Sequence, residues 1–155
     1  MAYDYKPAGR FFEDWKVGDT FDTAARTVTE ADIAIFAGLS GDYNPLHTNE
    51  EYAKDTIHKT RIAHGALIVA IASGLRNQTR ILEGTTIGLA GITEKFTAPT
   101  RAGDTIHCHC EILSTRETKK PDRGLVVYRC QTINQNDVVV VDQELTVMIR
   151  RKPQA

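Results

Sequence analysis

The segment SGDYNPLH, residues 40–47, contains an aspartate and a histidine five positions apart. A carboxylate and an imidazole that meet at one point can hold a water molecule and transfer protons in both directions, which is general acid–base catalysis. On an α-helix, Asp42 and His47 would lie roughly 140° apart around the axis, so a helix would separate them. Pro45 disfavours helical geometry in the residue before it, and Gly41 permits conformations that other residues resist. The segment is therefore predicted to turn, and a turn can direct both side chains to one point.

These residue types are also ordinary turn formers, so the segment alone leaves two interpretations open. In one, Asp42 and His47 form a catalytic pair. In the other, the segment is a surface turn capped by the aspartate, with a solvated histidine nearby.

A second candidate is the tripeptide AHG at residues 63–65, where a long polar segment meets an apolar helix. A helix N-terminus presents unpaired N–H groups and the positive end of the helix dipole. Gly65 has no side chain to obstruct its amide, which could donate to a carbonyl oxygen as that oxygen gains negative charge. Alternatively, His64 only caps the helix and Gly65 only packs tightly. Together, the acid–base pair and the oxyanion donor predict proton chemistry beside a polarised carbonyl.

Other chemistry-bearing residues are not expected to form sites. The tetrapeptide HCHC, residues 107–110, resembles a metal-ligand cluster, but strand alternation points its histidines and cysteines to opposite faces, whereas a metal site needs converging ligands. Asp55 and His58 lack a turn-forcing residue and are expected in a solvated loop. Residues 150–152, RRK, are expected to be a solvated basic end. No nucleotide-binding pattern is present, and we predict neither a metal nor a cofactor.

The whole chain limits the function classes. Its 155 residues suit one domain, and 41% hydrophobic and 25% charged residues are typical of a globular protein. A formal net charge of -1 gives no reason to expect a nucleic-acid or membrane partner. An odd number of cysteines, three, within apolar strand-like runs favours a reducing compartment, and we expect a cytoplasmic protein. The longest apolar stretch, residues 65–75, is too short to span a bilayer.

The first half of the chain must position these residues. We expect a strand over residues 20–29, then a short helix with Thr29 as N-cap and Asp32 in its first turn, ending at Gly38 or Gly41. Residues 41–63 are expected to be a functional loop with a helical turn at 49–55. A helix over residues 64–82 follows, apolar on every side of its first three turns, which predicts that protein surrounds it.

The second half is predicted to be a mostly antiparallel sheet. Alternating hydrophobicity and turn residues indicate strands over residues 85–99, 105–113, 125–133 and 138–150, with a hairpin turn at 134–137. Four or five strands against one buried helix form an α+β layered fold, in which the sheet wraps around the helix.

The segments GLSGDYNPLHTNEEYA and RIAHGAL closely resemble the signature of the MaoC-like dehydratase family, which includes the (R)-specific enoyl-CoA hydratases. The segments FEDWKVGDTF and FTAPTRAGDT resemble two more of its recurrent segments. The resemblance covers residues 10–150, leaving an N-terminal lead-in at 1–9 and a basic tail at 151–155. It implies a single hot-dog domain, in which a curved antiparallel sheet wraps around a long buried helix, and a homodimer or higher homo-oligomer.

The resemblance also implies a reaction and its residues. The reaction is reversible syn addition of water to a trans-2-enoyl thioester, giving an (R)-3-hydroxyacyl thioester. Asp42 and His47 would hold the catalytic water, the Gly65 amide would receive the thioester oxygen, and Asn44 would support the loop by hydrogen bonding. Ser40 and His64 are further supporting residues in this prediction. Coenzyme A or acyl carrier protein enters only as part of the substrate.

Two other functions remain open at this point. A hot-dog thioesterase would hydrolyse the same class of thioester, and a non-catalytic module would only bind it. The intact SGDYNPLH segment argues against both, since binding alone needs neither Asp42 nor His47. Lys59, Arg61 and Arg101 could meet the phosphates of the carrier, although solvation is the expected role of each one.

Overall fold

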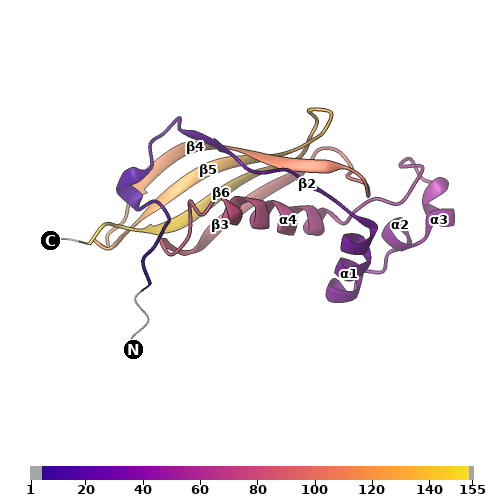
Figure 1. Cartoon of the computed structure of the whole chain (residues 1–155), viewed down its shortest axis with the longest axis horizontal. Helices are drawn as coiled ribbons and strands as arrows, with labels where there is room; N and C mark the ends of the chain where they lie inside the picture. The colour runs from indigo at the N-terminus through magenta and orange to yellow at the C-terminus, as the bar shows by residue number, and fades with distance from the viewer. Residues whose placement is uncertain (1–4, 154–155) are drawn as a thin grey trace.

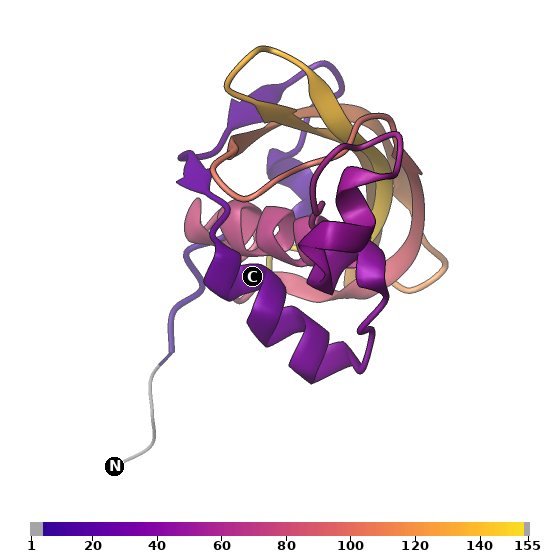
Figure 2. The same ribbon diagram turned by 90° about the vertical axis from the view of Figure 1, so that its right-hand side faces the viewer.

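The computed structural model describes residues 5–153, and its centre is one antiparallel sheet. The strands are β1 (Thr20–Asp22), β2 (Arg26–Thr27), β3 (Thr86–Phe96), β4 (Thr105–Glu117), β5 (Arg123–Asn134) and β6 (Val139–Arg150). Their order is β1-β4-β5-β6-β3, with β2 paired to β4. The sheet curves around helix α4 (Gly65–Gln78), which lies on its concave face (Figures 1 and 2). The predicted α+β hot-dog fold is confirmed.

Strand β4 follows the predicted alternation. Ile106, Cys108 and Cys110 are fully buried against the core, whereas His107 and His109 face the other side of the sheet. The three cysteines of the chain are buried free thiols. The HCHC segment therefore does not converge on a metal ion, as expected from the strand period.

Strand β3 forms an edge of the sheet and differs from the other long strands. It pairs only with β6, and Ile87, Leu89 and Ile92 are 41%, 56% and 44% exposed. An edge strand with exposed apolar side chains offers unpaired backbone groups to another chain.

Helix α4 is shorter and less enclosed than predicted. It ends at Gln78 rather than near residue 82, because Thr79 closes the last turn and Arg80 has a positive φ of 61°. Leu67, Ile68 and Ile71 are among its buried residues. The prediction that protein surrounds the helix is wrong for this chain alone, since small residues of the opposite face are exposed: Ala66, Ala70 and Gly74.

The segment before α4 forms three short helices at the end of the sheet opposite the chain termini (Figure 1). Helix α1 (Glu30–Ser40) begins at the predicted N-cap Thr29, which forms a capping box with Asp32. It ends at Gly41, whose φ of 76° only glycine adopts without cost. Helix α2 (Pro45–Thr48) was not predicted, and α3 (Glu50–Lys54) corresponds to the expected helical turn. The expected loop thus contains two short helices, and residues 55–64 between α3 and α4 form the remaining loop.

Two predictions at the chain ends need correction. The strand expected over residues 20–29 is divided into β1 and β2. The basic end is not merely solvated, because Arg151 pairs with Glu13 at 2.7 Å and Lys152 pairs with Asp14. Both carboxylates belong to the 3-10 helix η1 (Phe12–Asp14), and the pairs join the end of the described chain to its beginning.

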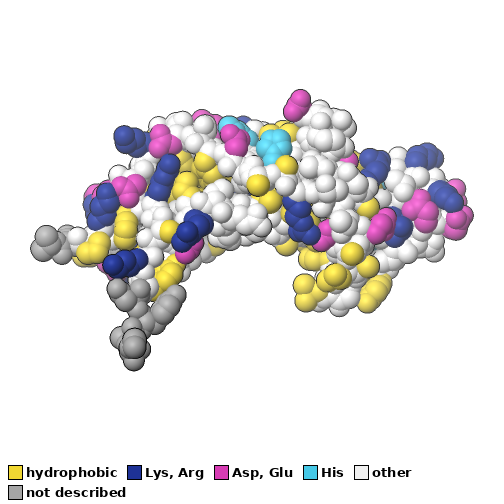
Figure 3. Space-filling view, in the orientation of Figure 1, with side chains coloured by type: hydrophobic (Ala, Val, Ile, Leu, Met, Phe, Trp, Pro, Cys, Tyr) yellow, Lys and Arg dark blue, Asp and Glu magenta, His cyan; other side chains and the backbone are white. Residues whose placement is uncertain are grey.

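Hydrophobic side chains gather on the surface of α1 (Figure 3), where Ile35 and Leu39 are 70% and 80% exposed. None of the helices within residues 5–153 is long and apolar enough to cross a bilayer.

Candidate functional site

The turn after α1 positions Asp42 through a chain of local hydrogen bonds. The Ser40 hydroxyl donates to the Phe36 carbonyl at 2.7 Å and accepts from the Asp42 amide at 3.2 Å. The Asp42 carboxylate accepts from the Asn44 amide at 3.1 Å. The Asn44 side-chain oxygen accepts from the Leu46 amide at 3.0 Å and caps α2. The predicted turn exists, and Pro45 at the first helical position explains why a helix can follow at once.

His47 lies on α2, one turn after the Asn44 cap, and its ring is oriented by a backbone group. Its Nδ1 lies 2.8 Å from the Ile62 carbonyl oxygen. A carbonyl can only accept, so Nδ1 carries the hydrogen and neutral His47 keeps a lone pair on Nε2. This lone pair is available as a proton acceptor.

His64 holds the two parts of the site together. It is 3% exposed, and its Nε2 donates to the backbone carbonyl of Asp42 at 2.9 Å. Its ring stacks on His47, with centroids 3.9 Å apart and planes 29° apart, and lies 5.1 Å from the ring of Phe36. Its Nδ1 is buried without a hydrogen-bond partner in the described structure. His64 therefore does more than begin a helix, although it does not cap α4 with its side chain.

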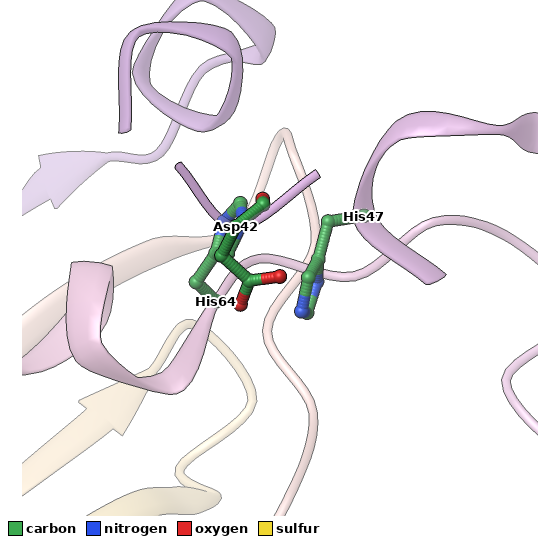
Figure 4. Close-up of side chains that lie close together, drawn as sticks. All are labelled: Asp42, His47 and His64. Atoms are coloured by element: carbon green, nitrogen blue, oxygen red, sulfur yellow. The ribbon is translucent and has the colours of Figure 1, made fainter. Parts of the chain in front are cut away.

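Asp42, His47 and His64 come together in space. One ligand-type atom of each lies within 4.8 Å of the others, and the Asp42 carboxylate points towards the His47 ring (Figure 4). Such spacing could also suit a metal ion. However, stacked imidazoles present their in-plane lone pairs side by side rather than towards one point, which disfavours a shared ion. The arrangement suits the holding of a water molecule between a carboxylate and an imidazole.

Gly65 is the first residue of α4. Within residues 5–153, neither its amide nor that of Ala66 donates to a protein acceptor, as expected in the first turn of a helix. A Cβ on Gly65 would lie 2.6 Å from the ring of Phe96 on β3, so a larger residue here requires the ring to move. The bond from the Ala63 amide to the Thr100 carbonyl, 2.8 Å long, ties this helix end to the loop after β3.

A cavity of about 610 Å³ opens beside these groups. His47 and Gly65 both line it, and most of its remaining lining is apolar, including Ile68, Phe96 and Val141. His58 also lines it, which corrects the expectation of a solvated loop for this residue. A largely apolar cavity with a few convergent polar groups is typical of a small-molecule site.

The three cationic side chains considered as contacts for the phosphates of coenzyme A or acyl carrier protein have different environments. Arg61 pairs with Glu30 and Glu50, each at 3.1 Å, so its charge is already compensated. Arg101 donates to the His58 carbonyl at 3.1 Å and so holds the loop that carries a cavity residue. Lys59 is exposed and has no ion-pair partner in the described chain.

A second group of reactive side chains lies inside the fold, away from the cavity. The Arg76 guanidinium is 5% exposed and donates to Cys130 Sγ at 3.2 Å and to Gln143 Oε1 at 3.3 Å. Hydrogen bonds from the thiols of Cys108 and Cys110, with Arg76 alongside, lower the pKa of the Cys130 thiol. These strand positions were predicted only as core.

Several residues of the site could not be assigned from the sequence. Ile62 contributes a backbone carbonyl, and any residue type supplies that group. Phe96 and Glu94 also line the cavity, yet they lie on a strand far from residues 40–47 in the chain. The segment FTAPTRAGDT begins at Phe96 and resembles a recurrent family segment. This resemblance was the one feature of the sequence that could have indicated this part of the cavity wall.

Comparisons with known proteins identify the family of the chain. The profile of the MaoC like domain matches residues 13–147. The (R)-specific enoyl-CoA hydratase of Rhodospirillum rubrum is 40% identical over 139 residues, which cover 90% of this chain and 91% of that protein. The crystal structure of a MaoC-like dehydratase from the same organism has a TM-score of 0.83 at 33% identity, covering 94% of this chain and 100% of the other.

A protein of Mycobacterium tuberculosis described as a double hot-dog fold has a TM-score of 0.84 at 22% identity, covering 97% of this chain and 47% of the other. This match supports the fold alone. The domain profile and the 40% identical relative together establish the family. The chain belongs to the MaoC-like hydratase and dehydratase family, of which it has the hot-dog fold.

Proposed function

We propose that the protein is an (R)-specific enoyl-CoA hydratase or 3-hydroxyacyl-thioester dehydratase. The observation that carries the proposal is the approach of Asp42 to His47, which lines a largely apolar cavity together with Gly65, the first residue of α4. The name and 40% identity of the Rhodospirillum rubrum relative support it.

In the hydration direction, water lies between the Asp42 carboxylate and Nε2 of His47. One of these two groups takes a proton from the water as its oxygen bonds to C3. The C2–C3 π electrons move towards the thioester, and a proton is delivered to C2 on the same face. Negative charge that gathers on the thioester oxygen is stabilised by the Gly65 amide at the helix N-terminus. Asn44, Ser40 and His64 hold the two proton-transferring groups in position.

No bound cofactor or metal is needed for this proposal. The acyl group arrives as a thioester of coenzyme A or acyl carrier protein, and the protons come from water. The three buried free thiols suit the reducing cytoplasm, where we place the protein. Turnover is expected to persist after treatment with a chelator.

Incubation with crotonyl-CoA tests the proposal. Hydration removes the enoyl absorbance without releasing a free thiol, and chiral analysis of the product is expected to give the (R) form. Stoichiometric release of thiol would instead establish a thioesterase. Tight binding without either change would establish a binding module.

We further infer that the protein is a homodimer joined along β3. Support comes from the exposed apolar residues of this edge strand and from the uncovered small residues of α4. Sedimentation is expected to give twice the monomer mass, and Leu89→Asp with Ile92→Asp is expected to shift it towards the monomer. A monomeric mass for the unchanged protein would contradict the inference.

A further inference from the structure

Glu94 is a charged residue in a cavity that is otherwise largely apolar. It lies on β3 and lines the cavity shared by His47 and Gly65. The only other ionisable groups among the lining residues are His47 and His58. No lysine or arginine of residues 5–153 lies within ion-pair distance of Glu94. Glu94 is therefore the one carboxylate among the lining residues, and it has no cationic partner among residues 5–153.

The register of β3 and β6 fixes the direction of this side chain. Glu94 is paired with Gln143, and Phe96 is paired with Val141; both β6 partners are buried on the side of the core. Residues two apart in a strand face the same side, so Glu94 faces the cavity together with Phe96. Lys95 faces the opposite side of the sheet, where it lines a groove with Asp142 and Glu144.

A hydrogen-bonded chain holds the carboxylate in place. The Gln143 side-chain amide donates to Glu94 at 3.1 Å, and its oxygen accepts from the buried Arg76 at 3.3 Å. Gln143 is 1% exposed, so the donor is fixed within the fold. The guanidinium lies behind Gln143, and Glu94 is the member of the chain that lines the cavity.

The distance along β3 relates Glu94 to the acyl chain. Phe96 lies against Gly65, where the thioester oxygen would bind, and Glu94 is two residues further along the strand. Two residues of a strand span roughly 7 Å. The cavity wall also includes Ile68 and Val141, both 2% exposed. This apolar inner region suits the hydrocarbon end of the acyl group, about four to six carbons from the carbonyl.

We propose that Glu94 is a specificity-determining residue that excludes carboxylated acyl groups and selects thioesters with an uncharged acyl chain. The inference rests on the proposed hydratase function and deepens it. A carboxylate on the fourth carbon of an enoyl chain would approach the Glu94 carboxylate, which is exposed in the described chain and lines the cavity. Two like charges about 8 Å apart repel by about 2 kcal/mol at an effective dielectric constant of about 20, which corresponds to roughly 30-fold.

The test compares trans-2-hexenoyl-CoA with glutaconyl-CoA, an enoyl thioester of similar length that ends in a carboxylate. For the unchanged protein we expect kcat/KM to be at least ~10-fold lower with glutaconyl-CoA. Glu94→Gln keeps the shape and the hydrogen bond from Gln143, and is expected to raise the glutaconyl-CoA value by ~10-fold while hexenoyl-CoA changes by less than ~3-fold. Equal rates for both substrates in the unchanged protein would overturn the proposal.

Two variants separate charge from structure. Glu94→Asp retains the charge and is expected to keep the difference in kcat/KM between hexenoyl-CoA and glutaconyl-CoA. If Glu94→Asp reduced this difference as much as Glu94→Gln does, a charge-based account would be overturned. Glu144→Gln removes a carboxylate from the opposite side of the same sheet and is expected to leave kcat/KM unchanged for both substrates. A parallel fall with both substrates in Glu94→Gln would assign the residue a structural role instead.

Binding of saturated thioesters tests the inference without turnover. Calorimetry is expected to give a Kd for glutaryl-CoA at least ~10-fold above that for hexanoyl-CoA, with the difference reduced in Glu94→Gln. If crotonyl-CoA is not hydrated but this difference is present, the proposed reaction fails and the role of Glu94 stands. If crotonyl-CoA is hydrated and the difference is absent, the role of Glu94 fails alone.

Discussion

An aspartate and a histidine approach each other in two regions of this molecule. Asp22 on β1 and His109 on β4 form a pair whose oxygen and nitrogen are 2.7 Å apart, with side chains 64% and 39% exposed. Asp42 and His47 form the other pair, between α1 and α4. The surface pair is in direct hydrogen-bond contact, yet it lies on the outer face of the sheet.

The two pairs differ in their surroundings, and the comparison shows that a catalytic site requires more than proximity of the two side chains. His47 lines a cavity of about 610 Å³, its ring is fixed by the Ile62 carbonyl, and the free amide of Gly65 lies at the same cavity. Neither Asp22 nor His109 lines that cavity. A water molecule held at the first pair can meet a polarised substrate, whereas the second pair can meet only solvent.

The largest effect is expected from removing either member of the first pair. Asp42→Asn and His47→Gln each retain the side-chain size and are expected to lower kcat with crotonyl-CoA by at least ~10²-fold. Circular dichroism is expected to show an unchanged fold, since Asp42 is exposed and His47 is only partly buried. A rate within threefold of the unchanged protein would remove that residue from the mechanism.

A smaller effect, ~10-fold to 10²-fold in kcat, is expected for Gly65→Ala. The new methyl group would lie 2.6 Å from the Phe96 ring, so the ring must shift, and the wall of the cavity changes beside the amide that receives the thioester oxygen. Phe96→Ala in the same chain makes room for the methyl group. Gly65→Ala is therefore expected to lower kcat less in the Phe96→Ala background than in the unchanged protein. Equal losses in both backgrounds would show that the clash is not the cause.

His64→Phe is expected to lower kcat by about 10-fold. Phenylalanine keeps a ring against His47 but removes the hydrogen bond from Nε2 to the Asp42 carbonyl, so the turn that carries Asp42 is held less firmly. As a positioning effect, the loss should appear in kcat with little change in KM. A rise in KM alone would indicate a substrate contact instead.

The smallest effect is expected for the surface pair. His109→Gln should leave kcat with crotonyl-CoA within ~2-fold and cost at most about 1 kcal/mol of unfolding free energy, because the pair is exposed to solvent. Kinetics and urea unfolding of the same preparation measure both values. A large fall in kcat would mean that proximity of an aspartate and a histidine is sufficient after all.

The two regions also differ in how far the sequence could predict them. Alternation in β4 predicted that His109 and Cys108 face opposite sides, because a strand has a period of two regardless of its partners. Gly41 and Pro45 predicted the turn at Asp42, because both restrict the backbone locally. The hot-dog fold and the family followed from these patterns together with the resemblance.

The cavity wall was beyond such local rules. Phe96, Glu94 and His58 reach the cavity through pairing of β3 with β6 and packing of the loop before α4, which depend on contacts distant in the chain. The exposed face of α4 was also missed, since its small apolar residues give the same pattern whether a helix is enclosed or covered by another copy.

The most direct test of the central claim is a double-mutant comparison at the first pair. If Asp42 and His47 act together on one water molecule, Asp42→Asn combined with His47→Gln should lower kcat with crotonyl-CoA by no more than about threefold beyond the worse single variant, because either change already disables the unit. Multiplied losses in the double variant, or a rate equal to that of the unchanged protein, would contradict the account.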